Sequence, residues 1–270
     1  MKIIDAHLHL FRPSENSAAM TRAVGHGNTP EDMLQVYKEH NICAGIVMGN
    51  QHLSPEAYQF PEPFRYCIGV GSRYQRPGEE AEALIQAEEH LKRSSCAGIK
   101  IYAGYTLAYV SDPRFEPYYQ LAEKYDKPVA IHTGMTAGAG GQLKYAHPLT
   151  VDEVACTHPR VQFVLCHFGN PFLPEAAAVM EKNSNVAADL SGLLSGIVDL
   201  DWYFTRHAPY VERTRMWLHY LNDDSRFMFG TDFPAVNVPN YIAFISRLVD
   251  EESREKIFFD NANRIYSLGL

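Results

Sequence analysis

Eight short apolar runs recur along the chain with helical patterns between them, and this alternation restricts the folds that the chain can adopt. Several runs are almost continuously apolar, as expected of parallel strands that are covered on both faces. Strands that alternate with helices build either a closed barrel or an open doubly wound sheet. The expected strands are Ile3–Leu10, Ala44–Met48, Tyr66–Gly71, Ala97–Tyr102, Pro128–His132, Val161–His167, Asn185–Ser191 and Arg226–Asp232.

Two observations favour the closed barrel. No Gly-x-Gly-x-x-Gly segment follows the first strand, so the dinucleotide-binding fingerprint of many open sheets is missing. Residues of metal-ligand type recur at the ends of the first, fifth, sixth and eighth strands, and a closed ring brings such ends to one point. The 270 residues suit one such unit. We therefore expect one α/β domain over residues 1–270, folded as a (β/α)8 TIM barrel.

The residues at these strand ends are suited to bind a metal ion. They are His7, His9, His132, His167 and Asp232. Imidazole nitrogen suits zinc and similar transition ions better than calcium or magnesium. A single histidine on an apolar strand is more often an ordinary core residue, but five such groups at four strand ends favour one site. Three histidines, one aspartate and a water would form a catalytic site with an open position.

The spacing of the first two histidines predicts which face of the strand they occupy. Side chains alternate along a strand, so His7 and His9 point the same way, and we expect that way to be inward. The outward set would then be Ile4, Ala6, Leu8 and Leu10. Asp5 would share the inward face, one layer deeper, as a hydrogen-bond partner behind the ligands; the alternative is a buried carboxylate bonded to backbone.

Four motifs together resemble the amidohydrolase superfamily. They are Asp-Ala-His-Leu-His at 5–9, Ile-His-Thr-Gly at 131–134, Cys-His-Phe-Gly at 166–169 and Phe-Gly-Thr-Asp-Phe-Pro at 229–234. Within the superfamily they are most similar to the amidohydrolase-related branch of decarboxylases and lactonases. The resemblance implies one zinc or other divalent transition metal bound by His7, His9, His132 and Asp232. It implies that His167 lies beside the ion and that His167 and Asp232 are catalytic.

The resemblance also raises a two-metal alternative. Two-metal relatives carry a carboxylated lysine on the fourth strand, where Lys100 is expected, and His132 and His167 would then hold the second ion. We favour an unmodified Lys100 that binds an anionic substrate or pairs with a carboxylate, because the branch is typically mononuclear.

The family resemblance leaves several reactions open. We favour a metal-dependent hydrolase whose activated water attacks an amide or lactone-type bond. The first alternative is a zinc-dependent carboxy-lyase, but those relatives tend to be longer, whereas only 11–28 follows the first strand here. A metal-free lactonase and a non-catalytic metal-binding barrel are further alternatives. The Gly-Glu-x-Gly-Leu-Asp segment of the TatD-type nucleases is absent.

The two longest connections, 134–149 and 192–225, are expected to bind a small-molecule substrate. Basic and aromatic residues that follow strands suggest an anionic, cyclic substrate, although each alone is better explained as a solvated rim residue: Arg12, Arg73, Tyr102, Tyr105, Lys144, Tyr145 and Arg206. A net charge of −8 without a basic run argues against nucleic acid. The chain has no apolar run long enough for a membrane and no apparent signal peptide, so we expect a cytoplasmic protein. Monomer and homo-oligomer stay open.

Overall fold

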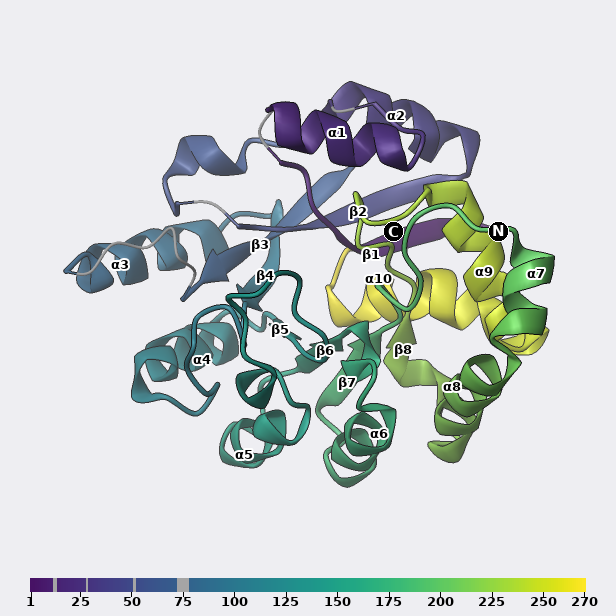
Figure 1. Cartoon of the computed structure of the whole chain (residues 1–270). Coiled ribbons are helices and arrows are strands. Elements are labelled where there is room, and N and C mark those ends of the chain that lie inside the picture. The colour runs from purple at the N-terminus through teal and green to yellow at the C-terminus, as the bar shows by residue number, and fades with distance from the viewer. Residues whose placement is uncertain (12–13, 28, 51, 72–77) are drawn as a thin grey trace.

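Eight parallel strands form one sheet in a computed structural model of the chain, in the spatial order β1 to β8 (Figure 1). The structure describes residues 1–11, 14–27, 29–50, 52–71 and 78–270. The order is the chain order, so each strand pairs with its predecessor after a helical crossover. The strands are β1 (Ile3–Leu8), β2 (Ile42–Met48), β3 (Phe64–Val70), β4 (Cys96–Ile101), β5 (Val129–His132), β6 (Phe163–Cys166), β7 (Val186–Asp189) and β8 (Phe227–Met228).

The first and last strands meet and close the ring. β8 is short, but the chain that follows it continues along β1. The Ala6 N–H donates to the Phe229 carbonyl at 2.9 Å, and the Asp232 N–H donates to the His7 carbonyl at 2.8 Å. The His9 N–H donates to the Phe233 carbonyl at 2.7 Å. The expected (β/α)8 barrel is therefore confirmed against the open sheet.

Helices surround the strands (Figure 1). Connection 192–225 carries two of them, and the segment after β1 carries a helix that the sequence had not predicted. None of the helices in the described parts of the chain is long and apolar enough to cross a membrane. The helices are α1 (Glu15–Ala23), α2 (Pro30–Glu39), α3 (Glu80–Leu91), α4 (Glu116–Lys124), α5 (Leu149–Thr157), α6 (Leu173–Lys182), α7 (Leu200–Arg206), α8 (Ala208–Tyr220), α9 (Val238–Leu248) and α10 (Asn261–Ile265).

A separate apolar cluster fills the inside of the barrel. It gathers residues from all eight strands, which can meet only in the interior, and α10 adds Ala262 and Ile265 to it. The larger apolar cluster includes the other side chains of most strands together with residues of the surrounding helices. The interior cluster contains Ile4, Ala6, Ala44, Ile46, Met48, Cys67, Ala97, Ala130, Val164, Cys166, Ala187 and Met228.

The membership of Ile4 and Ala6 in this cluster overturns their predicted outward placement, whereas Leu8 and Leu10 pack on the outer cluster as expected. The register explains the reversal: Asp5 pairs with Gly45 and Leu8 with Val47, so three steps along β1 oppose two steps along β2. A β-bulge of one extra residue therefore interrupts the alternation. Ala6 is inward before the bulge and His7 is inward after it, whereas Leu8 belongs to the outer cluster.

Candidate metal centre and active site

Three of the expected ligands converge at the mouth of the barrel. His7 and His9 come from the end of β1, and Asp232 comes from the segment after β8. The Asp232 Oδ1 atom lies 3.2 Å from His9 Nε2 and 3.5 Å from His7 Nε2. Asp232 holds a left-handed backbone with φ 59°, a conformation that costs energy for a non-glycine residue and is often found at functional sites.

His7 presents an unprotonated nitrogen to this point. Its Nδ1 lies 2.9 Å from Asp189 Oδ2, and an ionised carboxylate only accepts, so Nδ1 carries the hydrogen. Burial lowers the pKa of His7 to about 4, although Asp189 acts in the opposite direction, so the ring is neutral near pH 7. Its Nε2 is buried and has no hydrogen-bond partner among the described residues.

His9 is oriented in the same way. Its Nδ1 lies 3.1 Å from the Met48 carbonyl oxygen, which can only accept, so Nδ1 is the protonated nitrogen of the neutral ring. Its Nε2 then faces Asp232 with a lone pair. When both rings are neutral, two imidazole nitrogens and a carboxylate oxygen therefore point lone pairs at one another. This donor set fits a divalent transition ion.

His132 and His167 form the second half of the site. His132 Nδ1 lies 3.2 Å from His167 Nε2, and the other nitrogen of His132 lies 3.2 Å from the Met135 carbonyl. One ligand atom each of His7, His167 and Asp232 lie within 4.8 Å of one another. Burial lowers the pKa of both rings, and their proximity to each other lowers that of His132 further. The structure thus brings all five candidate residues into one cluster.

Asp189 and Ser191 complete the cluster, and neither was expected from the sequence. Burial acts to raise the pKa of Asp189, but His7 and His167 hold it below the ordinary value. The carboxylate accepts from the His167 N–H at 2.9 Å and also from the Ser191 hydroxyl. The one available signal was position: Asp189 lies inside an expected strand, two residues after Ala187, which faces inward.

Asp5 does not lie behind the ligand rings as expected. It accepts from the Thr231 N–H at 2.9 Å and hydroxyl at 2.7 Å, from the Tyr37 hydroxyl at 3.1 Å and from the His7 N–H at 3.2 Å. Burial outweighs these bonds and raises the pKa of Asp5 to about 6. The alternative interpretation is the better one: the β1 bulge turns this carboxylate toward α2, where it ties the backbones of β1 and the segment after β8 together.

Glycine is required where the chain after β8 passes β1. A Cβ atom at Gly230 would lie 2.9 Å from His7 Cβ and 3.1 Å from His7 N. A side chain there would push the segment after β8 away from β1, and Asp232 would move away from the histidines with it.

Lys100 is fully buried on β4, below the histidines. Its Nζ lies 2.6 Å from Cys166 Sγ, and no carboxylate pairs with it in the described part of the chain. Burial raises the pKa of the Cys166 thiol, and Lys100 offsets part of this effect. A thiol therefore takes the place of the carboxylate that was suggested as a partner of Lys100.

The expected substrate-contact residues divide into two groups. Tyr105 lies near the cluster: its ring centroid is 4.9 Å from that of His132, and its hydroxyl accepts from the Ala137 N–H in the connection after β5. Lys144 and Arg206 are exposed, and Arg12 and Arg73 lie outside the described residues. A small pocket lies beside the cluster; it is lined by His9, Leu10, Phe11, Thr21, Thr29, Pro30, Phe233 and Pro234.

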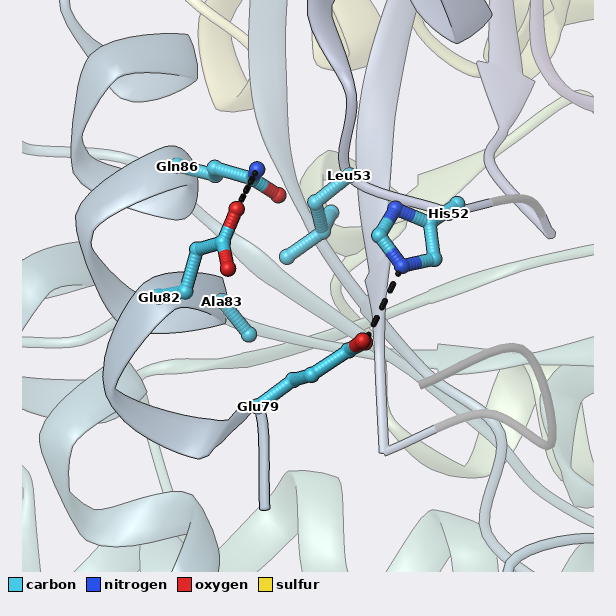
Figure 2. Close-up of a pocket in the computed structure, with 6 residues that line it drawn as sticks. All are labelled: His52, Leu53, Glu79, Glu82, Ala83 and Gln86. Carbon is cyan, nitrogen blue, oxygen red and sulfur yellow. Dashed lines mark hydrogen bonds and ion pairs between the residues drawn. The ribbon is translucent and has the colours of Figure 1, made fainter. Parts of the chain in front are cut away.

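A second small pocket lies over the first turns of α3. Figure 2 shows Glu79 pointing toward His52, with His52 Nε2 3.3 Å from the carboxylate, and Gln86 bonded to Glu82 along the helix. The side chains of His52 and Glu79 are 44% and 34% exposed, so water competes for both partners. Leu53 and Ala83 supply the apolar part of the lining. This pocket contains none of the candidate ligands.

The fold is shared with many solved structures. An uncharacterised TIM-barrel protein from Bordetella bronchiseptica is 21% identical over 99% of both chains, with a TM-score of 0.73. A probable 2-pyrone-4,6-dicarboxylic acid hydrolase from Acinetobacter baumannii, with citric acid bound, is 15% identical over 99% of this chain and 100% of that chain, with a TM-score of 0.64. A 5-carboxyvanillate decarboxylase from Novosphingobium aromaticivorans, complexed with manganese and 4-hydroxy-3-methoxy-5-nitrobenzoic acid, is 13% identical over 99% of this chain and 96% of that chain, with a TM-score of 0.67.

The family follows from the sequence match rather than from these distant structures. No functionally curated protein matches the chain. The family model described as amidohydrolase, however, matches residues 4–268, almost the whole chain. The matched segment contains every ligand candidate from His7 to Asp232. The chain therefore belongs to the amidohydrolase family.

Proposed function

We propose that this protein is a metal-dependent hydrolase that cleaves an amide or lactone-type bond in a small, anionic substrate. The observation that carries the proposal is the set of converging lone pairs at His7 Nε2, His9 Nε2 and Asp232 Oδ1, with His167 beside them. A buried donor set of this kind stays together at low cost only when a cation binds between its members. The proposed holders of one divalent ion are these three residues and His132.

A bound ion would supply Lewis-acid polarisation of a carbonyl and would lower the pKa of a water from 15.7 toward about 7. The side chains would then transfer the proton of this water. Burial keeps His167 neutral near pH 7, so its Nε2 can accept a proton from the attacking water and return it to the leaving group. Asp232 is a much weaker base, because the His167, His9 and His7 rings outweigh burial and lower its pKa. We assign Asp232 to holding the ion and orienting the water.

The anionic character of the substrate is proposed from the basic and aromatic side chains around the mouth of the barrel. Lys144 stacks its ammonium 4.7 Å from the centre of the Tyr145 ring in the connection after β5. Tyr105 joins the same connection to His132. The Acinetobacter hydrolase named above, whose structure holds citric acid, has the same fold. A ring with a carboxylate would place its apolar face on tyrosine and its charge near the lysine.

Non-oxidative decarboxylation is the second candidate. It needs the same ion and a group that protonates carbon, a task that His167 could also perform. The Novosphingobium decarboxylase shares the fold. The expected length difference does not separate the reactions, because the alignment with this decarboxylase covers 96% of its length.

The decisive experiment is a substrate screen of lactones, amides and aromatic carboxylates. The protein is purified without chelator, its zinc and manganese are counted, and half is stripped of metal and reloaded. We expect about one ion per chain and ring opening or bond cleavage that requires it. Carbon dioxide release would favour the carboxy-lyase. Full activity without metal would contradict the metalloenzyme, and a bound ion without turnover would favour a non-catalytic barrel.

A further inference from the structure

We propose that Ser191 is a positioning residue that decides which nitrogen of His167 carries the hydrogen. It does so by accepting a hydrogen bond from His167 Nδ1, and it thereby leaves Nε2 unprotonated toward the site. The inference deepens the proposed function, in which Nε2 is the base. The position of the hydrogen is nevertheless a property of the resting protein and can be tested without any substrate.

The direction of the bond between Ser191 and His167 follows from the neighbouring carboxylate. The Ser191 Oγ lies 2.8 Å from His167 Nδ1 and also contacts Asp189 Oδ1. A hydroxyl has one hydrogen, and an ionised carboxylate can only accept. The Ser191 hydrogen therefore points to Asp189, and its oxygen is left to accept from His167. If Ser191 donated to His167 instead, the lone pairs of Ser191 Oγ and Asp189 Oδ1 would face each other in a buried site.

Asp189 is held in the ionised form by donors on both of its oxygens. Oδ1 accepts from the His167 N–H at 2.9 Å and the Ser191 N–H at 3.2 Å, in addition to the Ser191 hydroxyl. Oδ2 accepts from His7 Nδ1 at 2.9 Å. Four donors around one fully buried carboxylate stabilise its charge strongly. One side chain thus orients a proposed ligand, His7, and the proposed base, His167.

The backbone around His167 fits this arrangement closely. His167 has a left-handed backbone with φ 64°, and the bond from its N–H to Asp189 holds it there. Gly192 also has a positive φ, and a Cβ atom at this position would lie 2.8 Å from His167 Nδ1. The residue next to Ser191 must therefore be glycine for the ring to reach the hydroxyl.

The consequence is that three of the histidines share one arrangement. In the neutral ring, one nitrogen gives its hydrogen to an oxygen and the other nitrogen is left unprotonated. The acceptors are Asp189 for His7, the Met48 carbonyl for His9 and the Ser191 hydroxyl for His167. His132 differs, because its hydrogen can go to the Met135 carbonyl or to His167 Nε2, each at 3.2 Å. Of the three acceptors only the Ser191 hydroxyl is also a donor, so only His167 depends on a further residue, Asp189, for its orientation.

The test is nitrogen NMR of the full chain labelled with 15N-histidine, without metal and near pH 8, where the ring is neutral. The shifts of Nδ1 and Nε2 report which nitrogen is protonated, and His167→Gln identifies the signals. We expect His167 to be protonated at Nδ1 in the natural protein and in Ser191→Thr, which keeps the hydroxyl. In Ser191→Ala we expect a mixture of tautomers or a shift to protonated Nε2.

A matched control separates this role from the loss of any buried serine. Ser253 is also buried and donates to a carboxylate, Asp224, at 2.5 Å, but no histidine accompanies it. Ser253→Ala should leave the His167 signals unchanged. A natural protein protonated at Nε2, or a Ser191→Ala protein that keeps Nδ1 protonated, would overturn the inference even if the variant unfolds partly on heating.

Activity provides the second readout once a substrate is known. Ser191→Ala should lower kcat by about 10- to 100-fold, the usual effect of removing a partner that orients a functional histidine, with KM little changed. Ser191→Thr should restore most of it. If the screen finds no turnover, the proposed function fails while the NMR result still stands or falls on its own.

Discussion

Two histidine–carboxylate pairs in this barrel have the same chemistry but differ in burial. His7 and Asp189 lie 2.9 Å apart and are both almost fully buried. His52 and Glu79 lie 3.3 Å apart over α3, with a third or more of each side chain exposed (Figure 2). In the buried pair the carboxylate determines the tautomer of the ring, and the other nitrogen has no hydrogen-bond partner within the described parts of the chain. Both partners of the exposed pair contact water, so neither side chain strongly fixes the orientation of the other.

Burial, rather than the presence of the pair, therefore marks the functional histidine. An exposed imidazole can satisfy both nitrogens with solvent. A buried imidazole with one unpaired nitrogen is costly unless an ion or substrate occupies the space beside it. The following variants test whether this contrast holds.

The largest effect is expected at the shared carboxylate. Asp232→Asn keeps the size of the side chain but removes the charge that both His7 and His9 face. We expect kcat to fall by about a thousandfold and bound metal to fall below one ion per chain, because a neutral amide is a poor ligand for this ion. Steady-state kinetics and metal analysis check both results. Retained activity with normal metal content would show that the assigned role of Asp232 is wrong.

The second-largest effect is expected at Asp189, which bonds the Nδ1 atom of the proposed ligand His7. Asp189→Asn removes the charge and leaves one acceptor oxygen where His7, His167 and Ser191 need two. It should weaken metal binding by about 10- to 100-fold, as measured by competition with a chelating dye. Glu79→Gln makes the equivalent change in the exposed pair and should leave the affinity unchanged. An equal loss of metal affinity in Asp189→Asn and Glu79→Gln would show that burial does not distinguish the two pairs.

A third difference should appear in the pH dependence of stability. The pKa of His7 is about 4 in the folded protein against 6.5 for an ordinary histidine. The unfolded chain therefore binds a proton first as the pH falls, and the metal-free fold loses stability between about pH 6.5 and pH 4. The loss from this group is about 3 kcal/mol. Urea unfolding at several pH values measures it.

The variant His7→Asn should flatten this part of the profile, whereas His52→Asn should leave it unchanged. A profile that is already flat between pH 6.5 and pH 4 in the natural protein would mean that the His7 ring accepts a proton in the folded state without penalty.

The sequence predicted the barrel and the five clustered residues because both depend on local patterns. Apolar runs and strand-end polar residues repeat along the chain, and parallel topology brings their carboxyl ends together. It did not predict the inward faces of Ile4 and Ala6, because the bulge between Asp5 and Leu8 arises from pairing with β2. Asp189 and Ser191 were missed for a related reason: their partners, His7 and His167, are 182 and 24 residues away.

Helix starts show the same limit at a smaller scale. Thr29 and Thr150 are each followed three residues later by an acid, the spacing of a capping box. Thr29 does cap α2, with Asp32 completing the capping box. By contrast, α5 begins at Leu149, and the Thr150 hydroxyl donates to the His147 carbonyl instead. Pro148 precedes this helix with a helical backbone, so the chain has already turned before Thr150.

The smallest effect should come from the exposed pair itself. His52→Asn removes an ion pair whose partners are both hydrated, and such surface pairs contribute between 0 and about 1 kcal/mol. We expect the free energy of unfolding to change by less than about 0.5 kcal/mol and metal content to stay constant. Chemical denaturation beside Asp189→Asn gives the comparison in one assay. A loss at His52 as large as that at Asp189 would show that the pocket over α3 is a built site, and that burial alone does not identify the functional histidines of this barrel.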